Sequence, residues 1–390
     1  MSLLRRLSTR ILLLVVAAVV VGSASAVVVV KASGGSGATP PAKPLAQAIQ
    51  DALNAPKLTG ITARIKFTNN LIASGSLSGT SSPLLSGATG RLWATADGHL
   101  RLELQSDAGD AQVLSDGKTL SVYDASSNTV YKVALPAQKA DTGTKDATGA
   151  TVTLAKIEEA LTKLGSYADL TGATPTNIAG QQAYTVRLTP KHDGGLLGAV
   201  QVGWDALQGV PLRAAIYAQG DSSPVLELTA TDVTYGPVAA ADVNITPPAG
   251  AKVVDLSPPS STGDKNTPPV TGKAAVAAAV PFTLQAPDTL VGLPLKEVRL
   301  IDSGGSKGAA VVYGQGLGAI VVLERQPDAK AGSSGALGQL PPVTISGATG
   351  HELPTALGTV IQVEKGGVSY TLVGSLPSAA AEAAASALVP

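Results

Sequence analysis

A run of alternating apolar and polar residues between positions 90 and 133 restricts the fold of this chain more than any other feature. Leucine and valine recur at every second position, and short segments rich in glycine and aspartate interrupt the pattern. Alternation of this kind is typical of strands that bury one face, and the interruptions are typical of tight turns. The run therefore predicts antiparallel strands that form a sheet with one apolar and one polar face.

The same alternation predicts which side chains lie on the apolar, concave side of this sheet. It holds within the run and within an earlier strand that begins near residue 61. We expect these side chains to line an apolar cavity and to face two helices. They are Ile65, Phe67, Leu100, Leu102, Leu104, Val113, Leu120 and Val122.

Two amphipathic helices and further strands are predicted on either side of this run. One helix begins near Leu45 and ends at Pro56, and the second spans about 152–164, because apolar residues recur there every three or four positions. The chain has 43 glycines and 26 prolines, and only 14% of its residues are charged, which favours sheet and turns over helical bundles. Further strands are expected around 183–190, 198–204, 211–218, 223–235 and 243–256.

The N-terminal segment predicts an extracytoplasmic protein. Residues 11–30 contain no charge, and as a helix they would be about 30 Å long, enough to cross a bilayer core. Three arginines precede this run, which favours a cytoplasmic N-terminus with the rest of the chain outside. We expect residues 1–31 to remain as a single-pass signal anchor in the cell membrane. Because Ala24-Ser25-Ala26 fits a cleavage pattern, a secreted or periplasmic chain that begins after Ala26 is the alternative.

Composition divides the rest of the chain into two domains. Residues 32–43 form a polar spacer, and residues 44–256 hold the alternating strands and both predicted helices. Residues 257–281 are rich in proline, serine, threonine and glycine, which predicts a linker between domains. Residues 282–390 are then a small α+β domain that ends in an alanine-rich helix.

Several short motifs, taken in order, resemble the LolA family of periplasmic lipoprotein carriers. They are Gly90-Arg91-Leu92-Trp93, SDGKTLSVY (115–123), VRLTPKHDGG (186–195), PLRAAIY (211–217) and NITPPAGAKV (244–253). The resemblance covers residues 42 to about 255. It implies an incomplete antiparallel β-barrel with lining helices, whose apolar cavity holds an acyl chain. The chain departs from the family pattern at Ser121, where the family has tryptophan, and at residues 94–97, where the family has an arginine.

The layout of the whole chain also resembles the MucB/RseB regulators. The segments VVYGQGLGAIVVLE (311–324) and GGVSYTLVGSLPSAAAEAAASAL (366–388) are similar to the small second domain of that family. This resemblance implies a regulator of envelope stress that binds an anti-sigma factor outside the inner membrane.

The residue pattern predicts neither catalysis nor metal binding. The chain has no cysteine, and its three histidines, His99, His192 and His351, are scattered. Asp107, Asp110 and Asp116 each lie within two residues of a glycine, which is typical of turns. We therefore predict that the protein is not an enzyme and that it uses no cofactor and no metal ion.

The charge distribution restricts the partners. Residues 1–31 hold four basic residues and no acidic one, which leaves 24 basic and 28 acidic residues in the rest of the chain, a net charge of −4. A mildly acidic body argues against a nucleic-acid partner. We expect lipid or lipoprotein acyl chains at the membrane, as in the sorting of outer-membrane lipoproteins. The alternative partner is a membrane protein such as an anti-sigma factor.

Overall fold

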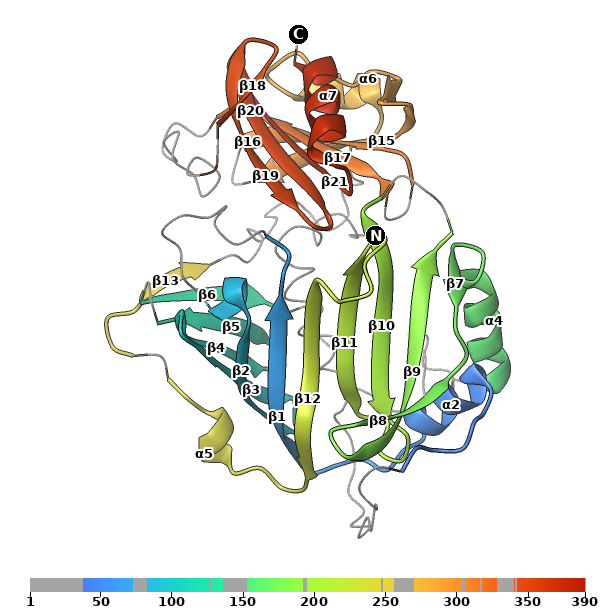
Figure 1. Cartoon of the computed structure of the whole chain (residues 1–390). Helices are drawn as coiled ribbons and strands as arrows, with labels where there is room; N and C mark the ends of the chain where they lie inside the picture. The colour runs from blue at the N-terminus through green and yellow to red at the C-terminus, as the bar shows by residue number, and fades with distance from the viewer. Residues whose placement is uncertain are drawn as a thin grey trace.

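The chain forms two mainly antiparallel sheets in a computed structural model (Figure 1). The described residues are 38–389 without 73–82, 126–127, 136–152, 192–194, 247, 256–269, 304–305, 316–317, 328–339 and 341. The predicted anchor, residues 1–31, and residues 257–269 of the predicted linker lie outside the described residues. Within the part that is described, no helix is long and apolar enough to span a bilayer.

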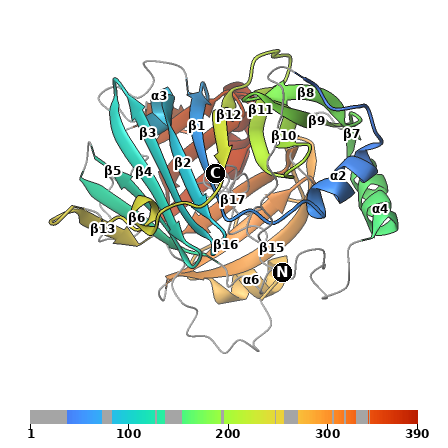
Figure 2. The same cartoon turned by 90° about the horizontal axis from the view of Figure 1, so that it is seen from below.

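The larger sheet curls into an incomplete barrel, which Figure 2 shows from one end. It contains β1 (Gly60–Asn69), β2 (Ala88–Thr95), β3 (His99–Ser106), β4 (Gly109–Asp116), β5 (Thr119–Asp124), β6 (Thr129–Ala134), β7 (Ala168–Leu170), β8 (Thr174–Ile178), β9 (Gln181–Pro190), β10 (Leu197–Asp205), β11 (Pro211–Ala218), β12 (Leu226–Tyr235) and β13 (Lys252–Asp255). The strand order is β13-β6-β5-β4-β3-β2-β1-β12-β11-β10-β9-β7, and β8 also pairs with β9. Among the described strands of this sheet, only the short β13 runs parallel to its neighbour, β6. The predicted mainly β class with an open, curled sheet is confirmed.

The register of the larger sheet places its apolar residues on one face. Leu102 lies opposite Leu92 and Val113, and Val113 lies opposite Val122. Residues directly opposite each other in a sheet share a face. Each of the eight apolar side chains predicted for this face is at most 6% exposed. The predicted alternation is therefore present, whereas the part of these residues in ligand binding stays a prediction.

The two longer helices before the second sheet do not face the eight predicted apolar residues, although we expected them to do so. Helix α2 (Leu45–Leu53) packs through Ala48 against Tyr184 of β9 and Trp204 of β10, and α4 (Leu154–Leu164) packs against α2. Among the described residues, neither helix contributes to the buried cluster that contains Leu102 and Val113. The segment before α2 pairs with Ala173 beyond β7, so α2 begins at that edge of the sheet. The helices therefore cover the β9–β10 end of the sheet instead of the eight predicted residues. Two short helices, α3 (Pro83–Ser86) and α5 (Ala240–Val243), contact β1 to β4 instead.

The second sheet contains eight of the described strands. They are β14 (Thr289–Leu290), β15 (Leu293–Ser303), β16 (Ser306–Tyr313), β17 (Ile320–Arg325), β18 (Pro342–Ile345), β19 (Ala348–Thr355), β20 (Gly358–Lys365) and β21 (Val368–Gly374). Helix α7 (Ser378–Leu388) is the predicted alanine-rich helix, and it buries Ala381 and Ala384 against this sheet. Helix α6 (Lys273–Ala279) packs against the same core through Val276, which is fully buried.

Helix α6 shows that the second half of the predicted linker belongs to the core of the second sheet. The segment 273–280 is rich in alanine and valine, so it can form a short helix with an apolar side. Thr271 also bridges to Arg299 of β15. The proline and serine content that suggested a linker lies before Val270, apart from Pro281 at the end of the predicted linker.

A turn of the second sheet reaches into the open end of the larger sheet (Figure 1). Ala356 and Leu357, between β19 and β20, pack against the apolar cluster of the larger sheet. The Ala356 amide donates to the Leu71 carbonyl at 2.8 Å, and the Leu196 amide donates to the Ser375 hydroxyl at 2.8 Å. The apolar face of the larger sheet is therefore closed at this end by residues of the second sheet.

Candidate apolar binding site

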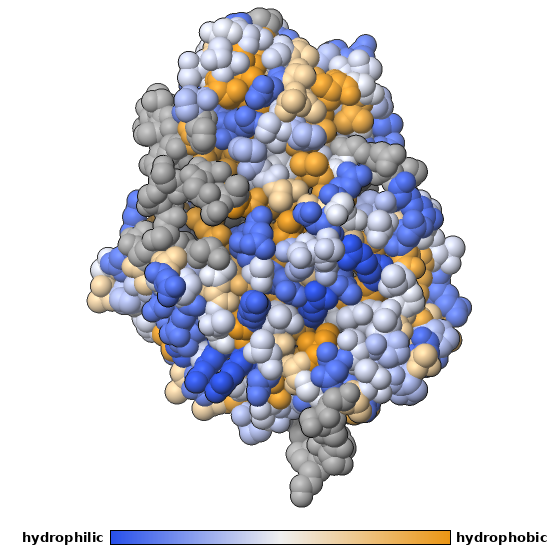
Figure 3. All heavy atoms as spheres, in the orientation of Figure 1, coloured by the Kyte–Doolittle hydropathy of each residue, from blue (hydrophilic) through white to orange (hydrophobic). Residues whose placement is uncertain are grey.

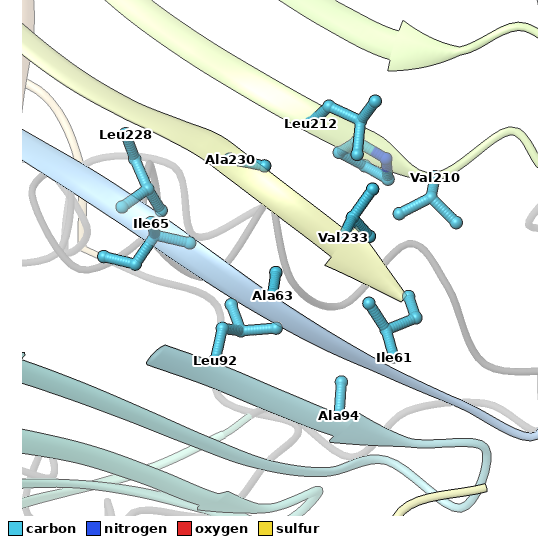
Figure 4. Close-up of a pocket in the computed structure, with 11 residues that line it drawn as sticks. Ile61, Ala63, Ile65, Leu92, Ala94, Val210, Leu212, Leu228, Ala230 and Val233 are labelled. Carbon is cyan, nitrogen blue, oxygen red and sulfur yellow. The ribbon is translucent and has the colours of Figure 1, made fainter. Parts of the chain in front are cut away.

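An apolar cavity of about 40 Å³ lies on the inner face of the larger sheet (Figure 4). Strands β1, β2, β11 and β12 contribute to it near the ends that lie away from the second sheet. Its lining contains only apolar residues: Ile61, Ala63, Ile65, Leu92, Ala94, Val210, Pro211, Leu212, Leu228, Ala230 and Val233.

Small side chains create this cavity. Ala63 lies opposite Leu92 and Val233, and Ala94 lies opposite Ile61 and Leu100. At Ala63 and Ala94 the inner face therefore carries only a methyl group, and larger, mostly branched side chains surround it. The strands cannot move together to fill the space that is left, because hydrogen bonds fix the distance between their backbones. We expect this space to be dry, because no polar side chain lines it.

A buried carboxylate shapes the rim beside the cavity. Asp205, at the end of β10, is 2% exposed, and its Oδ1 accepts hydrogen bonds from the amides of Leu207 and Gln208, each at 2.8 Å. Its Oδ2 accepts from the Tyr235 hydroxyl at 2.6 Å. Burial and the neighbouring Asp205 raise the pKa of Tyr235 well above its usual range. Asp205 thus ties the turn before Val210 to the end of β12.

We expect Tyr235→Phe to reduce the free energy of unfolding by about 1–3 kcal/mol, because it leaves a buried carboxylate oxygen without its donor. Chemical denaturation followed by tryptophan fluorescence measures the change. Tyr123→Phe is the control, since the Tyr123 hydroxyl donates to Asn128 at an exposed position. An equal, small effect of both substitutions would show that Asp205 does not depend on Tyr235.

Only Ile65 among the eight predicted residues lines the cavity. Phe67, Leu102, Leu104, Val113, Leu120 and Val122 lie in the same buried cluster as the cavity residues, and Leu100 is buried outside that cluster. Six of the eleven lining residues come from β11, β12 and the turn before them, and none of the six was among the predicted residues. The alternation of Leu226, Leu228 and Ala230 was the signal that could have identified them.

The outer face of the larger sheet is polar and ordered by ion pairs. Arg213 of β11 donates to Glu227 and to Gln201, each at 2.6 Å, and to the Tyr217 hydroxyl at 3.0 Å. The guanidinium of Arg187 lies 4.1 Å from the centre of the Tyr217 ring. Hydrophilic residues gather over the middle of the view in Figure 3. These contacts brace neighbouring strands from the side opposite to the cavity.

The histidines and turn aspartates do not form a metal-binding cluster within the described residues. His99 lies 3.2 Å from Asp97, His351 contacts the Leu340 carbonyl, and His192 lies outside the described residues. Asp116 accepts from the amides of Lys118 and Thr119, as a turn former does. Across the described ranges, no group of three or more histidines and acidic residues could hold a metal ion.

Solved structures similar to this chain include members of both families that its motifs resemble. No family model and no curated protein matches the chain. MucB in its complex with MucA from Pseudomonas aeruginosa is 17% identical, with 87% of this chain and 96% of that chain covered and a TM-score of 0.44. A further MucB structure is 18% identical, with 89% and 98% covered and a TM-score of 0.38. A LolA superfamily protein from Nitrosomonas europaea is 10% identical, with 52% and 99% covered and a TM-score of 0.22.

Proposed function

We propose that this chain is a membrane-anchored, extracytoplasmic binding protein that holds an acyl chain of a lipid or lipoprotein against the inner face of its larger sheet. The observation that carries the proposal is a continuous apolar face that ends in a cavity lined without a polar residue. Such a surface can hold a hydrocarbon chain, since each methylene removed from water contributes about 0.8 kcal/mol. The predicted anchor and the motifs similar to LolA carriers support the same function.

The size of the cavity requires the site to open for a ligand. Its volume of about 40 Å³ is roughly a tenth of the smallest ordinary ligand pocket. Two partly buried leucines pack against the apolar cluster at its ends: Leu58, which precedes β1, and Leu357 in the β19–β20 turn. Both come from connecting segments, which open at lower cost than strands do. An acyl chain would take their place on the inner face.

A regulator that binds a membrane protein is the second candidate. The small volume of the cavity favours it, because a protein partner needs no cavity of the size of an acyl chain. The contact between the two sheets supports it also, since a partner that separates Leu357 from the inner face would couple both sheets to binding. Native mass spectrometry of the purified chain separates the two candidates by whether lipid is retained.

Adding the same side chain at two inner positions tests the proposed cavity. Ala63→Ile places new atoms in the cavity, so we expect unchanged or slightly higher stability and weaker binding of a fluorescent fatty acid. Ala111→Ile is the matched control, because Ala111 is 1% exposed and lies outside the cavity lining. Overpacking there should cost about 1–3 kcal/mol. Thermal melting of lipid-free protein and fatty-acid titration give both readings.

The wild-type protein decides between the candidates in the same titration. Wild-type chain that binds no fatty acid would end the carrier proposal and leave the regulator. Binding that survives Ala63→Ile undiminished would place the acyl chain elsewhere than in this cavity.

A further inference from the structure

Two segments that carry exposed leucines meet at the end of the larger sheet that points away from the second sheet. Leu53, the last residue of α2, is 47% exposed, and Leu207, in the turn between β10 and β11, is 59% exposed. Their neighbours in the chain are in backbone contact, because a Cβ atom added to Gly209 would lie 2.3 Å from the carbonyl oxygen of Ala52, the residue before Leu53. We call Leu53 and Leu207 the leucine pair.

The leucine pair lies at the end of the sheet where the apolar cavity is found. Val210 and Pro211 of the cavity lining follow the turn of Leu207 directly. Ile61 at the start of β1 and Val233 near the end of β12 are also cavity residues. The second sheet contacts the opposite strand ends, through Leu71 after β1 and Leu196 before β10.

The described chain also begins at this end of the sheet. The Ala38 carbonyl accepts from the Asn177 side chain at 3.3 Å, and the Pro41 carbonyl accepts from the Tyr184 hydroxyl at 2.6 Å. Asn177 precedes the turn between β8 and β9. Just beyond that turn, the Gln182 carbonyl accepts from the Ala206 amide, which belongs to the turn of Leu207. Residues 38–43 of the predicted spacer therefore run along the sheet near the leucine pair.

The length of chain between the predicted anchor and Ala38 limits how far this end of the larger sheet can lie from the membrane. Lys31 closes the predicted anchor, and the seven Cα steps from Lys31 to Ala38 span at most about 25 Å. Strand β1 has ten residues and is therefore about 33 Å long. If Lys31 stays at the membrane surface, Ala38 lies within about 25 Å of that surface. This distance is shorter than β1, so the second sheet, which lies at the far end of β1, cannot lie between Ala38 and the bilayer.

We infer that the leucine pair docks on the outer surface of the membrane that holds the anchor, so that the apolar cavity faces the lipid. The inference rests on the proposed function, because it takes residues 1–31 as a retained anchor, and it adds the direction from which an acyl chain enters. The occupant is the bilayer itself. Two exposed leucines at the same end of the sheet as an apolar cavity match the boundary between headgroups and acyl chains, where apolar side chains are buried by a few ångströms.

The absence of cysteine from the sequence makes a site-specific probe straightforward. The full chain carrying Leu207→Cys is labelled with an environment-sensitive fluorophore and reconstituted in vesicles of phosphatidylcholine and phosphatidylglycerol. Tyr167→Cys is the matched control, because Tyr167 is 63% exposed and lies at the other end of the sheet, where its carbonyl accepts from the Lys191 amide. Both positions are exposed, so neither substitution disturbs a core.

We expect quenching by a spin-labelled phospholipid to be at least threefold stronger at position 207 than at position 167, and Leu53→Ser to reduce the signal at position 207. Equal quenching at both positions, or stronger quenching at position 167, would overturn the inference. Loss of the first 26 residues with release of the chain from the vesicles would overturn it as well.

Fatty-acid binding measured on the same vesicles separates this inference from the proposed function. Fatty-acid binding without preferential quenching at position 207 rejects the docking surface and keeps the carrier. Preferential quenching without fatty-acid binding keeps the docking surface and rejects the carrier.

Discussion

Replacing Gly90 by alanine should destabilise the larger sheet by at least about 3 kcal/mol. Gly90 lies in β2 between Ile65 of β1 and Leu104 of β3. A Cβ atom at this position would lie 1.8 Å from the Glu103 carbonyl oxygen, a distance at which one of the two strands has to move. The cost is steric, since backbone atoms of a central strand cannot turn aside as a side chain does.

Urea denaturation followed by the fluorescence of Trp93, three residues along β2, measures this loss. Gly172→Ala is the control, because a Cβ atom there meets nothing within 4 Å. We expect that substitution to change the free energy of unfolding by less than about 0.5 kcal/mol. Similar midpoints for both variants would mean that β2 and β3 are farther apart than the structure places them. Gly90 is also the first residue of the Gly-Arg-Leu-Trp motif, so the close approach gives a physical reason for glycine there.

The stability of the second sheet should fall by about 3 kcal/mol between pH 4.5 and pH values above 7. Glu324 of β17 is 1% exposed. Its Oε2 accepts from the Gln285 amide at 2.9 Å, and its Oε1 is buried without a hydrogen-bond partner within the described structure. Burial raises the pKa of Glu324 to about 7 from the usual 4.5, and the hydrogen bond from Gln285 lowers it by a smaller amount.

The direction of the effect follows from where the proton binds. Between pH 4.5 and pH 7 the folded chain keeps the Glu324 proton, whereas the unfolded chain has lost it. Stability is therefore complete below pH 4.5 and falls as the pH rises toward 7. Burial and the neighbouring Glu324 also raise the pKa of the Tyr313 hydroxyl of β16 and of the Tyr370 hydroxyl of β21 above the usual 10. Both tyrosines are therefore protonated in the folded and the unfolded chain below pH 7 and add nothing to this change.

Glu324→Gln removes the ionisation and keeps the shape of the side chain. We expect this variant to be more stable than the wild type at pH 8 and to lose most of the difference between pH 5 and pH 8. Hydrogen exchange of the β17 and β21 peptides measures the second sheet separately from the larger one. Glu364→Gln is the control, because Glu364 is an exposed residue of β20 in the same sheet. A wild-type protein whose exchange in β17 follows only the intrinsic pH dependence would contradict the buried, protonated carboxyl.

The sequence alone determined the mainly β class, the alternation that buries one face of the larger sheet, and most of its strands. These features depend on periodicity and on turn residues, which act between neighbours in the chain. The predicted strands around 183–190, 198–204 and 211–218 lie within β9, β10 and β11. The burial of Leu102 and Val113 followed for the same reason, since a side chain in a strand has only two faces available.

Only the tertiary structure decided which inner residues surround a cavity and where buried charges lie. Ala63 and Val233 meet because β1 pairs with β12, which is more than 150 residues away in the chain and whose register no local pattern specifies. The contact of Asp205 with Tyr235 and the burial of Glu324 likewise depend on how the sheets curl and pack. Helix α6 falls within the predicted linker because its single buried valine gains its partners only from the second sheet. Contacts of this kind arise from the closure of long loops, so their residues cannot be recognised from their neighbours in sequence.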